Sequence, residues 1–264
     1  METNNSFSMQ RFILLCKQSL IINKKLIGIS LVGFSGTLFI ALIFLQSVNH
    51  FNNWRNENYM ATFAVAFFSL GLVYSSLSFP AFRSKERSMT FLMLPTSSSE
   101  KYVFELMSRI VLFMLLMPLL FWIVANLEGA IVHSFVPEFA NFKFSFGEGW
   151  SKITQKEPFD GWAKLAMVQG CLFVFIAPFV GASHFSKSPL LKTLFSLSLI
   201  MAGYALFTFL LVKGLNLEEY HPANDRVLFI SNEHQAIASL AIGTTVINLC
   251  FLAIAFFRLK EKEA

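Results

Sequence analysis

Few residues of this chain have both the chemical character and the position to act on a bound molecule, and Glu128 is the foremost of them. It is the only acidic residue within reach of a long apolar run, eighteen residues after Ile110, and His133 follows it closely. Carboxylates at such positions commonly bind substrates or relay protons. Because Glu128 lies near the end of its run, the favoured interpretation is a side chain that reaches the outer lipid headgroups, with a substrate or gate contact as the alternative.

Other chemistries have little support in the sequence. The segment 214–234 combines imidazoles with carboxylates, but their spacing matches no metal-ligand pattern, and a solvated acidic loop is favoured. The chain contains no Walker A, HExxH or G-x-S-x-G sequence. We therefore expect no catalytic residue, no metal site and no bound cofactor in this chain.

Six long apolar runs must position the polar residues. Each is about as long as the roughly 20 helical residues that cross a hydrocarbon core. The runs, which contain no Lys, Arg, Asp or Glu, are Leu26–Val48, Tyr59–Phe82, Ile110–Leu127, Leu165–Ser186, Thr193–Val212 and Gln235–Phe257. We expect the third helix to continue to residue 134, giving transmembrane helices at 26–48, 59–82, 110–134, 165–186, 193–212 and 235–257. The sequence thus predicts an all-α integral membrane protein with one membrane domain over residues 1–264.

Lys and Arg residues are distributed unevenly between the two sides that these spans define. If the N-terminus is cytoplasmic, the segments 1–25, 83–109, 187–192 and 258–262 carry fourteen of them, and the opposite side carries seven. This is the positive-inside pattern, and it predicts that both termini are cytoplasmic. Topology and contact with anionic headgroups then explain the net charge of +5, and we expect no nucleic-acid partner.

Residues 7–25 form an amphipathic segment before the first span. Polar pairs recur every seven residues, at Gln10/Arg11, Lys17/Gln18 and Lys24/Lys25, with apolar residues between them. A helix with one narrow basic stripe and a broad apolar face should lie in the cytoplasmic interface. It could be a simple lead-in to the first span, or it could brace the bundle and frame a cytoplasmic partner.

The connection 83–109 is the longest on the cytoplasmic side and contains two helix signals. A charge cluster of Arg83, Lys85, Glu86 and Arg87 precedes an apolar patch that includes Phe91, Leu92 and Leu94. Pro95 ends whatever helix precedes it. Ser97 followed by Glu100 fits a capping box, so a helix should restart near Ser98 and run into the third span. The patch either docks a cytoplasmic protein or lies on lipid or under its own bundle.

This layout resembles the membrane subunit of ABC-2 type exporters. Six spans with cytoplasmic ends, the amphipathic segment and the structured connection carry the resemblance. The stretch Leu-Pro-Thr-Ser-Ser-Ser-Glu-Lys at 94–101 is similar to that of small permeases of Bacteroidetes-type bacteria. The resemblance implies an interfacial connecting helix at 7–25 and a location in the bacterial inner membrane. The ATPase-coupling residues it implies are Arg83, Lys85, Glu86, Arg87, Phe91, Leu92 and Leu94.

The resemblance also implies two kinds of partner. One is a cytoplasmic ABC ATPase subunit, which would bind and hydrolyse the ATP. The other is a second permease, identical or homologous, so that two chains surround the path of a hydrophobic, lipid-like or peptide-like substrate. Gly28, Gly33 and Gly36 are candidate points of close helix approach, either within one chain or between two.

Two other function classes remain open. A non-transporting membrane scaffold of a secretion, motility or signalling complex would need no ATPase. A secondary transporter should show broken helices or ionisable groups at membrane depth, for which Glu128 is the one candidate.

Overall fold

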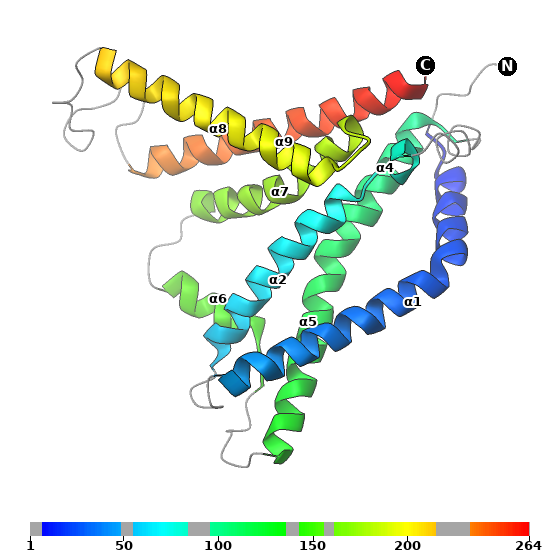
Figure 1. Cartoon of the computed structure of the whole chain (residues 1–264), viewed down its shortest axis with the longest axis vertical. Helices are drawn as coiled ribbons and strands as arrows, with labels where there is room; N and C mark the ends of the chain where they lie inside the picture. Colours follow the sequence, from blue (N-terminus) through cyan, green and yellow to red (C-terminus); the bar gives the residue numbers. More distant parts are fainter. Residues whose placement is uncertain are drawn as a thin grey trace. The chain divides into compact units, whose positions relative to one another are not determined.

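The computed structural model describes residues 7–48, 55–83, 96–135, 143–155, 161–214 and 233–263, and every regular element within them is helical (Figure 1). Six helical stretches are long and apolar enough to cross a membrane. They are α1 (Met9–Val48), α2 (Asn56–Ser76), α4 (Ser98–Leu106) continued through the π-helical turn η2 (Met107–Val111) into α5 (Leu112–Phe135), α7 (Gly161–His184), α8 (Pro189–Gly214) and α9 (Glu233–Glu263). The predicted multi-pass helical membrane protein is thus supported.

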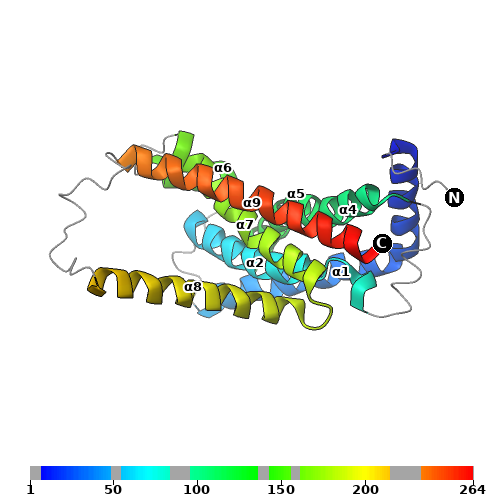
Figure 2. The ribbon, with the colours of Figure 1, turned by 90° about the horizontal axis from the view of Figure 1, so that it is seen from above.

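The helices pack into two compact units. The N-terminal unit comprises Met1–Gly71 and Pro95–Pro158, and the C-terminal unit comprises Leu72–Leu94 and Phe159–Ala264. In the first, α1 packs on α4 and α5. In the second, α7 packs on α8 and on α9, and Figure 2 shows α9 running along α7.

Helix α1 is longer than one membrane crossing requires. Its 40 residues measure about 60 Å at about 1.5 Å per residue, which is roughly twice the thickness of a hydrocarbon core. The structure joins the predicted segments 7–25 and 26–48 into this one helix, and Figure 1 shows it bending between an upper and a lower part. Only part of α1 can therefore cross the membrane directly.

Aromatic side chains form much of the core of the N-terminal unit. Phe63 of α2 lies 5.1 Å from Phe121 of α5 and 4.9 Å from Phe146, measured between ring centroids. Phe144 lies 4.7 Å from Phe146 and 5.5 Å from Phe121. The short segment before Phe146 is therefore packed into the same core as the long helices.

That packing explains α6 (Phe146–Gln155), a short helix between α5 and α7 that the sequence analysis did not predict. Asn126 of α5 holds Phe144, which lies two residues before α6. The Asn126 amide nitrogen donates to the Phe144 carbonyl at 3.3 Å, and its oxygen accepts from the Phe144 amide at 3.1 Å. Asn56 of α2 likewise donates to the Ser145 carbonyl at 2.9 Å. These contacts join residues distant in sequence, so hydropathy could not predict them.

Helix α2 ends at Ser76, and the prediction that it continues to Phe82 is wrong. Serine hydroxyls near its end donate back to carbonyls of the preceding turn, as Ser78 does to Ser75 at 2.7 Å. Phe79 then adopts a positive φ of 52° immediately before Pro80, where the helical conformation is disfavoured. The chain continues as the 3₁₀ turn η1 (Pro80–Arg83). The apolar run continues to Phe82, but the serine side-chain hydrogen bonds and the conformation of Phe79 before Pro80 end the helix.

Close packing of α7 on α8 gives a first prediction. A Cβ atom added at Gly181 would lie 1.6 Å from Oγ1 of the buried Thr193, whereas one added at Gly170, in the same helix, would meet open space. Gly181→Ala should therefore lower the free energy of unfolding by about 1–3 kcal/mol through overpacking. Thermal unfolding of the purified variants would measure this, with Gly170→Ala as the matched control. Equal unfolding temperatures for the two variants would contradict the packing described here.

Candidate functional site

Among the predicted ATPase-coupling residues, Arg83 is the one within the described part of the chain. Lys85, Glu86, Arg87, Phe91, Leu92 and Leu94 lie outside it. Arg83 ends η1, is exposed, and donates from Nη2 to the Ser76 carbonyl at 2.9 Å. It thereby supplies a partner to a carbonyl at the end of α2, where helical hydrogen bonding stops.

The start of the connection belongs to the C-terminal unit and packs on its helices. Phe79 stacks on Phe82 with centroids 5.6 Å apart and contacts Phe179 of α7 at 5.0 Å. Lys262, in the last turn of α9, lies with Nζ 4.0 Å from the centroid of the Phe82 ring and donates to the Ser183 carbonyl at 2.8 Å. A lysine at the carboxyl end of α7 complements the helix dipole there, so one side chain joins the ends of α7 and α9 to η1.

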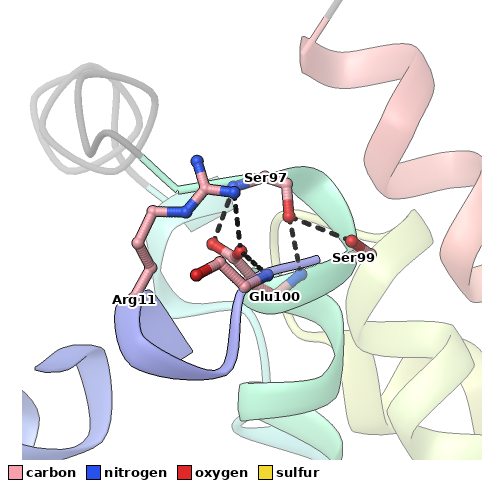
Figure 3. A network of polar contacts seen from close by, with 5 residues as sticks. Arg11, Ser97, Ser99 and Glu100 are labelled. Carbon is pink, nitrogen blue, oxygen red and sulfur yellow. Dashed lines mark hydrogen bonds and ion pairs between the residues drawn. The ribbon is translucent and has the colours of Figure 1, made fainter. Parts of the chain in front are cut away.

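The end of the connection has the predicted capping box. Ser97 is the N-cap of α4: its hydroxyl accepts from the Glu100 amide at 3.3 Å, and its own amide donates to the Glu100 carboxylate at 3.0 Å (Figure 3). The Ser97 and Ser99 hydroxyls lie 3.0 Å apart. The prediction of a helix that restarts near Ser98 and runs into the third span is confirmed.

Glu100 also binds the N-terminal helix, which the sequence did not predict. Its Oε1 accepts from the Ser8 amide at 2.7 Å and lies 3.2 Å from Nη2 of Arg11. The carboxylate has no exposed surface, whereas the Arg11 side chain is 32% exposed. Figure 3 shows Arg11 reaching over the capping box to Glu100. Residues 8–11 and 97–100 are therefore fastened together although about ninety positions separate them.

Glu128 lies in a second polar cluster, made of Gln46 from α1, Tyr59 from α2 and Glu128 from α5. None of the three side chains has exposed surface. The Tyr59 hydroxyl donates to Glu128 Oε2 at 2.7 Å, and Gln46 Nε2 lies 3.0 Å from the same oxygen and 2.7 Å from the tyrosine hydroxyl. The interpretation of Glu128 as a headgroup contact is therefore wrong, because neighbouring helices enclose its carboxyl group.

Among the described residues, two buried atoms of this cluster have no hydrogen-bond partner, namely Gln46 Oε1 and Glu128 Oε1. Buried polar atoms are nearly always paired, so such atoms call for a physical explanation. Gln46 and Tyr59 were not predicted as site residues, since neutral polar residues at the ends of apolar runs are common. What could have suggested them is their shared depth: all three residues lie near helix ends that the predicted topology places on the same side of the membrane.

Comparison of the chain with protein families, curated proteins and solved structures finds no match in any of the three.

Proposed function

We propose that this chain is the transmembrane subunit of an ABC-type exporter of the bacterial inner membrane. It would move a hydrophobic, lipid-like or peptide-like substrate out of the cytoplasm or the inner leaflet, using ATP hydrolysed by a separate cytoplasmic subunit. The observation that carries the proposal is the anchoring of both ends of the basic connection between α2 and α4.

The two ends of that connection are fastened to different units. Its start is held in the C-terminal unit by Phe79, Phe82 and Lys262. Its end is held in the N-terminal unit by the Ser97–Glu100 capping box, and Glu100 also binds Ser8 and Arg11 at the start of α1. A partner that pushed on residues 84–94 would therefore act on both units. A coupling element must act in this way if ATP hydrolysis in the partner is to move the helices.

The same proposal places the first part of α1 in the cytoplasmic interface. Leu14, Ile21 and Ile22 are more than half exposed, as expected for side chains that face lipid in the interface. The length of α1 and the basic stripe of residues 7–25 support this placement. Together with the positive-inside bias, it supports the proposal that both termini are cytoplasmic.

A second copy, or a paralogous permease, would complete the transport path. Cβ atoms added at Gly28, Gly33 and Gly36 would meet nothing within 4 Å, so these glycines are not needed for packing among the described residues of one chain. A helix surface of small residues permits the close approach that drives helix association in lipid.

Gly33→Leu should therefore leave the single chain folded but weaken self-association. Cross-linking in native membranes and sedimentation in detergent would measure the loss of dimer, and Gly170→Leu on α7, which also meets open space, is the matched control. If the dimer persists unchanged in Gly33→Leu, this surface of α1 is not the interface.

The proposal is tested by co-purification followed by an ATPase assay. A tagged chain should retain a protein with a Walker A sequence whose ATPase activity depends on the complex. The double variant Phe91→Asp/Leu92→Asp should release that protein, because charges disrupt an apolar docking contact, while the chain stays inserted in the membrane. Complexes that contain no ATPase, or a double variant that keeps its partner, would refute the proposal.

One observation favours a second candidate, a secondary transporter. The buried Gln46–Tyr59–Glu128 cluster is an ionisable site at membrane depth, which such transporters use for coupling ions. Transport by the chain alone in liposomes, driven by an ion gradient without ATP, would identify this class.

A further inference from the structure

We propose that Glu128 binds a proton within the N-terminal unit, and that Gln46, Tyr59 and Glu128 together form a proton site inside the helix bundle. This inference goes beyond the proposed function, because it concerns three residues of this chain and requires no ATPase partner.

A count of hydrogen atoms is the first argument. The Gln46 amide offers two hydrogens and the Tyr59 hydroxyl offers one. Gln46 Nε2 donates to the Tyr59 hydroxyl and to Glu128 Oε2, and the Tyr59 hydroxyl donates to the same carboxylate oxygen. All three hydrogens are thus engaged, while Gln46 Oε1 and Glu128 Oε1 remain buried acceptors for which the described part of the chain supplies no donor. The cluster lacks a hydrogen, and a proton on the carboxyl group would provide it.

Charge is the second argument. Within the described part of the chain, no ion pair joins Glu128 to a Lys or Arg side chain. The titratable group in contact with it is Tyr59; the nearest others along the three helices are Lys25 on α1, Glu57 on α2 and His133 on α5. A carboxylate enclosed without a cation costs several kcal/mol, whereas a neutral carboxylic acid avoids this cost.

The small space within the cluster indicates that the species bound there is a proton. None of the three side chains has exposed surface, so the arrangement leaves no route for a substrate group. A metal ion such as Ca²⁺ would take about six to eight oxygen ligands, and the cluster offers two unpaired oxygens. A proton needs neither a cavity nor a ligand shell.

Reversing the Gln46 amide would not remove the need for a proton. Its oxygen would then lie 3.0 Å from Glu128 Oε2 and 2.7 Å from the Tyr59 hydroxyl. Three oxygens would share the single tyrosine hydrogen, so the contact between the glutamine and glutamate oxygens would itself require a hydrogen between them. Both orientations of the amide therefore point to a protonated carboxyl group.

The position of the cluster shows how the proton could exchange. Gln46 lies two residues before the end of α1, Tyr59 three residues after the start of α2, and Glu128 seven residues before the end of α5. Seven residues of helix span about 10 Å, so a local opening of these helix ends would bring water to Glu128. Release of the proton would leave an enclosed anion, which is tolerated only if α1, α2 and α5 separate enough to hydrate it. Proton release and opening of the bundle are thus linked.

Infrared difference spectroscopy of the purified protein in lipid nanodiscs at neutral pH tests the proposal. The wild-type protein should show a carbonyl band of a protonated carboxylic acid that shifts on exchange into D₂O. The band should be absent in Glu128→Gln and retained in Glu148→Gln, where an exposed carboxylate of α6 in the same unit is removed. Tyr59→Phe keeps the acid but removes one hydrogen bond to it, so the band should remain and shift.

Three infrared results would overturn the proposal. If Glu128→Gln removes only carboxylate absorption, or if the wild-type protein shows no acid band, the proposal is overturned. Should Glu128→Gln fail to fold, Glu128→Asp keeps the acid and should shift the band; an acid band that is identical in Glu128→Asp and in the wild-type protein would overturn the proposal as well.

Discussion

Replacing Glu128 by alanine should destabilise the protein strongly, whereas replacing it by glutamine should not. Alanine leaves a buried cavity and removes the acceptor of hydrogen bonds from Gln46 and Tyr59, so the expected loss is about 3–5 kcal/mol. Glutamine has nearly the shape of a protonated glutamate and keeps an oxygen that can accept from Gln46 and Tyr59. The expected loss for Glu128→Gln is therefore below about 1 kcal/mol.

Thermal unfolding in detergent measures the difference between the two variants. The alanine variant should unfold roughly 10 °C below the wild-type protein, at about 2–4 °C per kcal/mol for a chain of this size, and the glutamine variant within a few degrees of it. Leu127→Ala, next to Glu128 but more than half exposed, is the control for truncation on the same turn. If the glutamine variant is as unstable as the alanine variant, the cluster does not hold a neutral carboxyl group.

Replacing Glu100 by alanine should have the second-largest effect, because one carboxylate holds three donors. The loss of the capping box costs about 1 kcal/mol, and the loss of the bond from the Ser8 amide costs about 1 kcal/mol more. The ion pair with Arg11, whose side chain is 32% exposed, adds about 0.2–1 kcal/mol. The sum, about 2–3 kcal/mol, is an upper value, since the contacts share one side chain.

Limited proteolysis can distinguish this loss of anchoring from a general loss of stability. In Glu100→Ala, the segment before α1 should be cleaved faster, because Ser8 and Arg11 lose their common partner. Arg11→Ala is the matched control: it keeps the capping box and should destabilise the chain less, by about 1 kcal/mol or below. Equal cleavage of Glu100→Ala and the wild-type protein would contradict the role of Glu100 in holding the first turn of α1.

Local signals in the sequence predicted the helices and the capping box. Ser97 and Glu100 are three residues apart, so their reciprocal hydrogen bonds follow from spacing alone. The long apolar runs likewise predicted six membrane-crossing helices. The end of α2 was mispredicted because the prediction used hydropathy alone. Hydropathy does not report the hydrogen bonds of the serine hydroxyls or the conformation of Phe79 before Pro80, which end the helix.

Contacts between distant residues could not be predicted from one sequence. The ion pair between Arg11 and Glu100 and the enclosure of Glu128 by Gln46 and Tyr59 depend on which helices become neighbours. Periodicity indicates which face of a helix is apolar, but not which helix covers it. Glu128 was therefore predicted to reach the outer lipid headgroups, although its carboxyl group is fully enclosed.

Site-specific photo-cross-linking from the connection between α2 and α4 tests the central claim most directly. A photoreactive phenylalanine at Phe91, in the proposed coupling element, should form a cross-link in native membranes to a cytoplasmic protein that binds and hydrolyses ATP. The same group at Phe135, at the opposite end of the third span and highly exposed, should not reach that protein. Cross-linking from Phe91 only to lipid, to this chain itself or to proteins without a nucleotide site would contradict the assignment as an ABC exporter subunit.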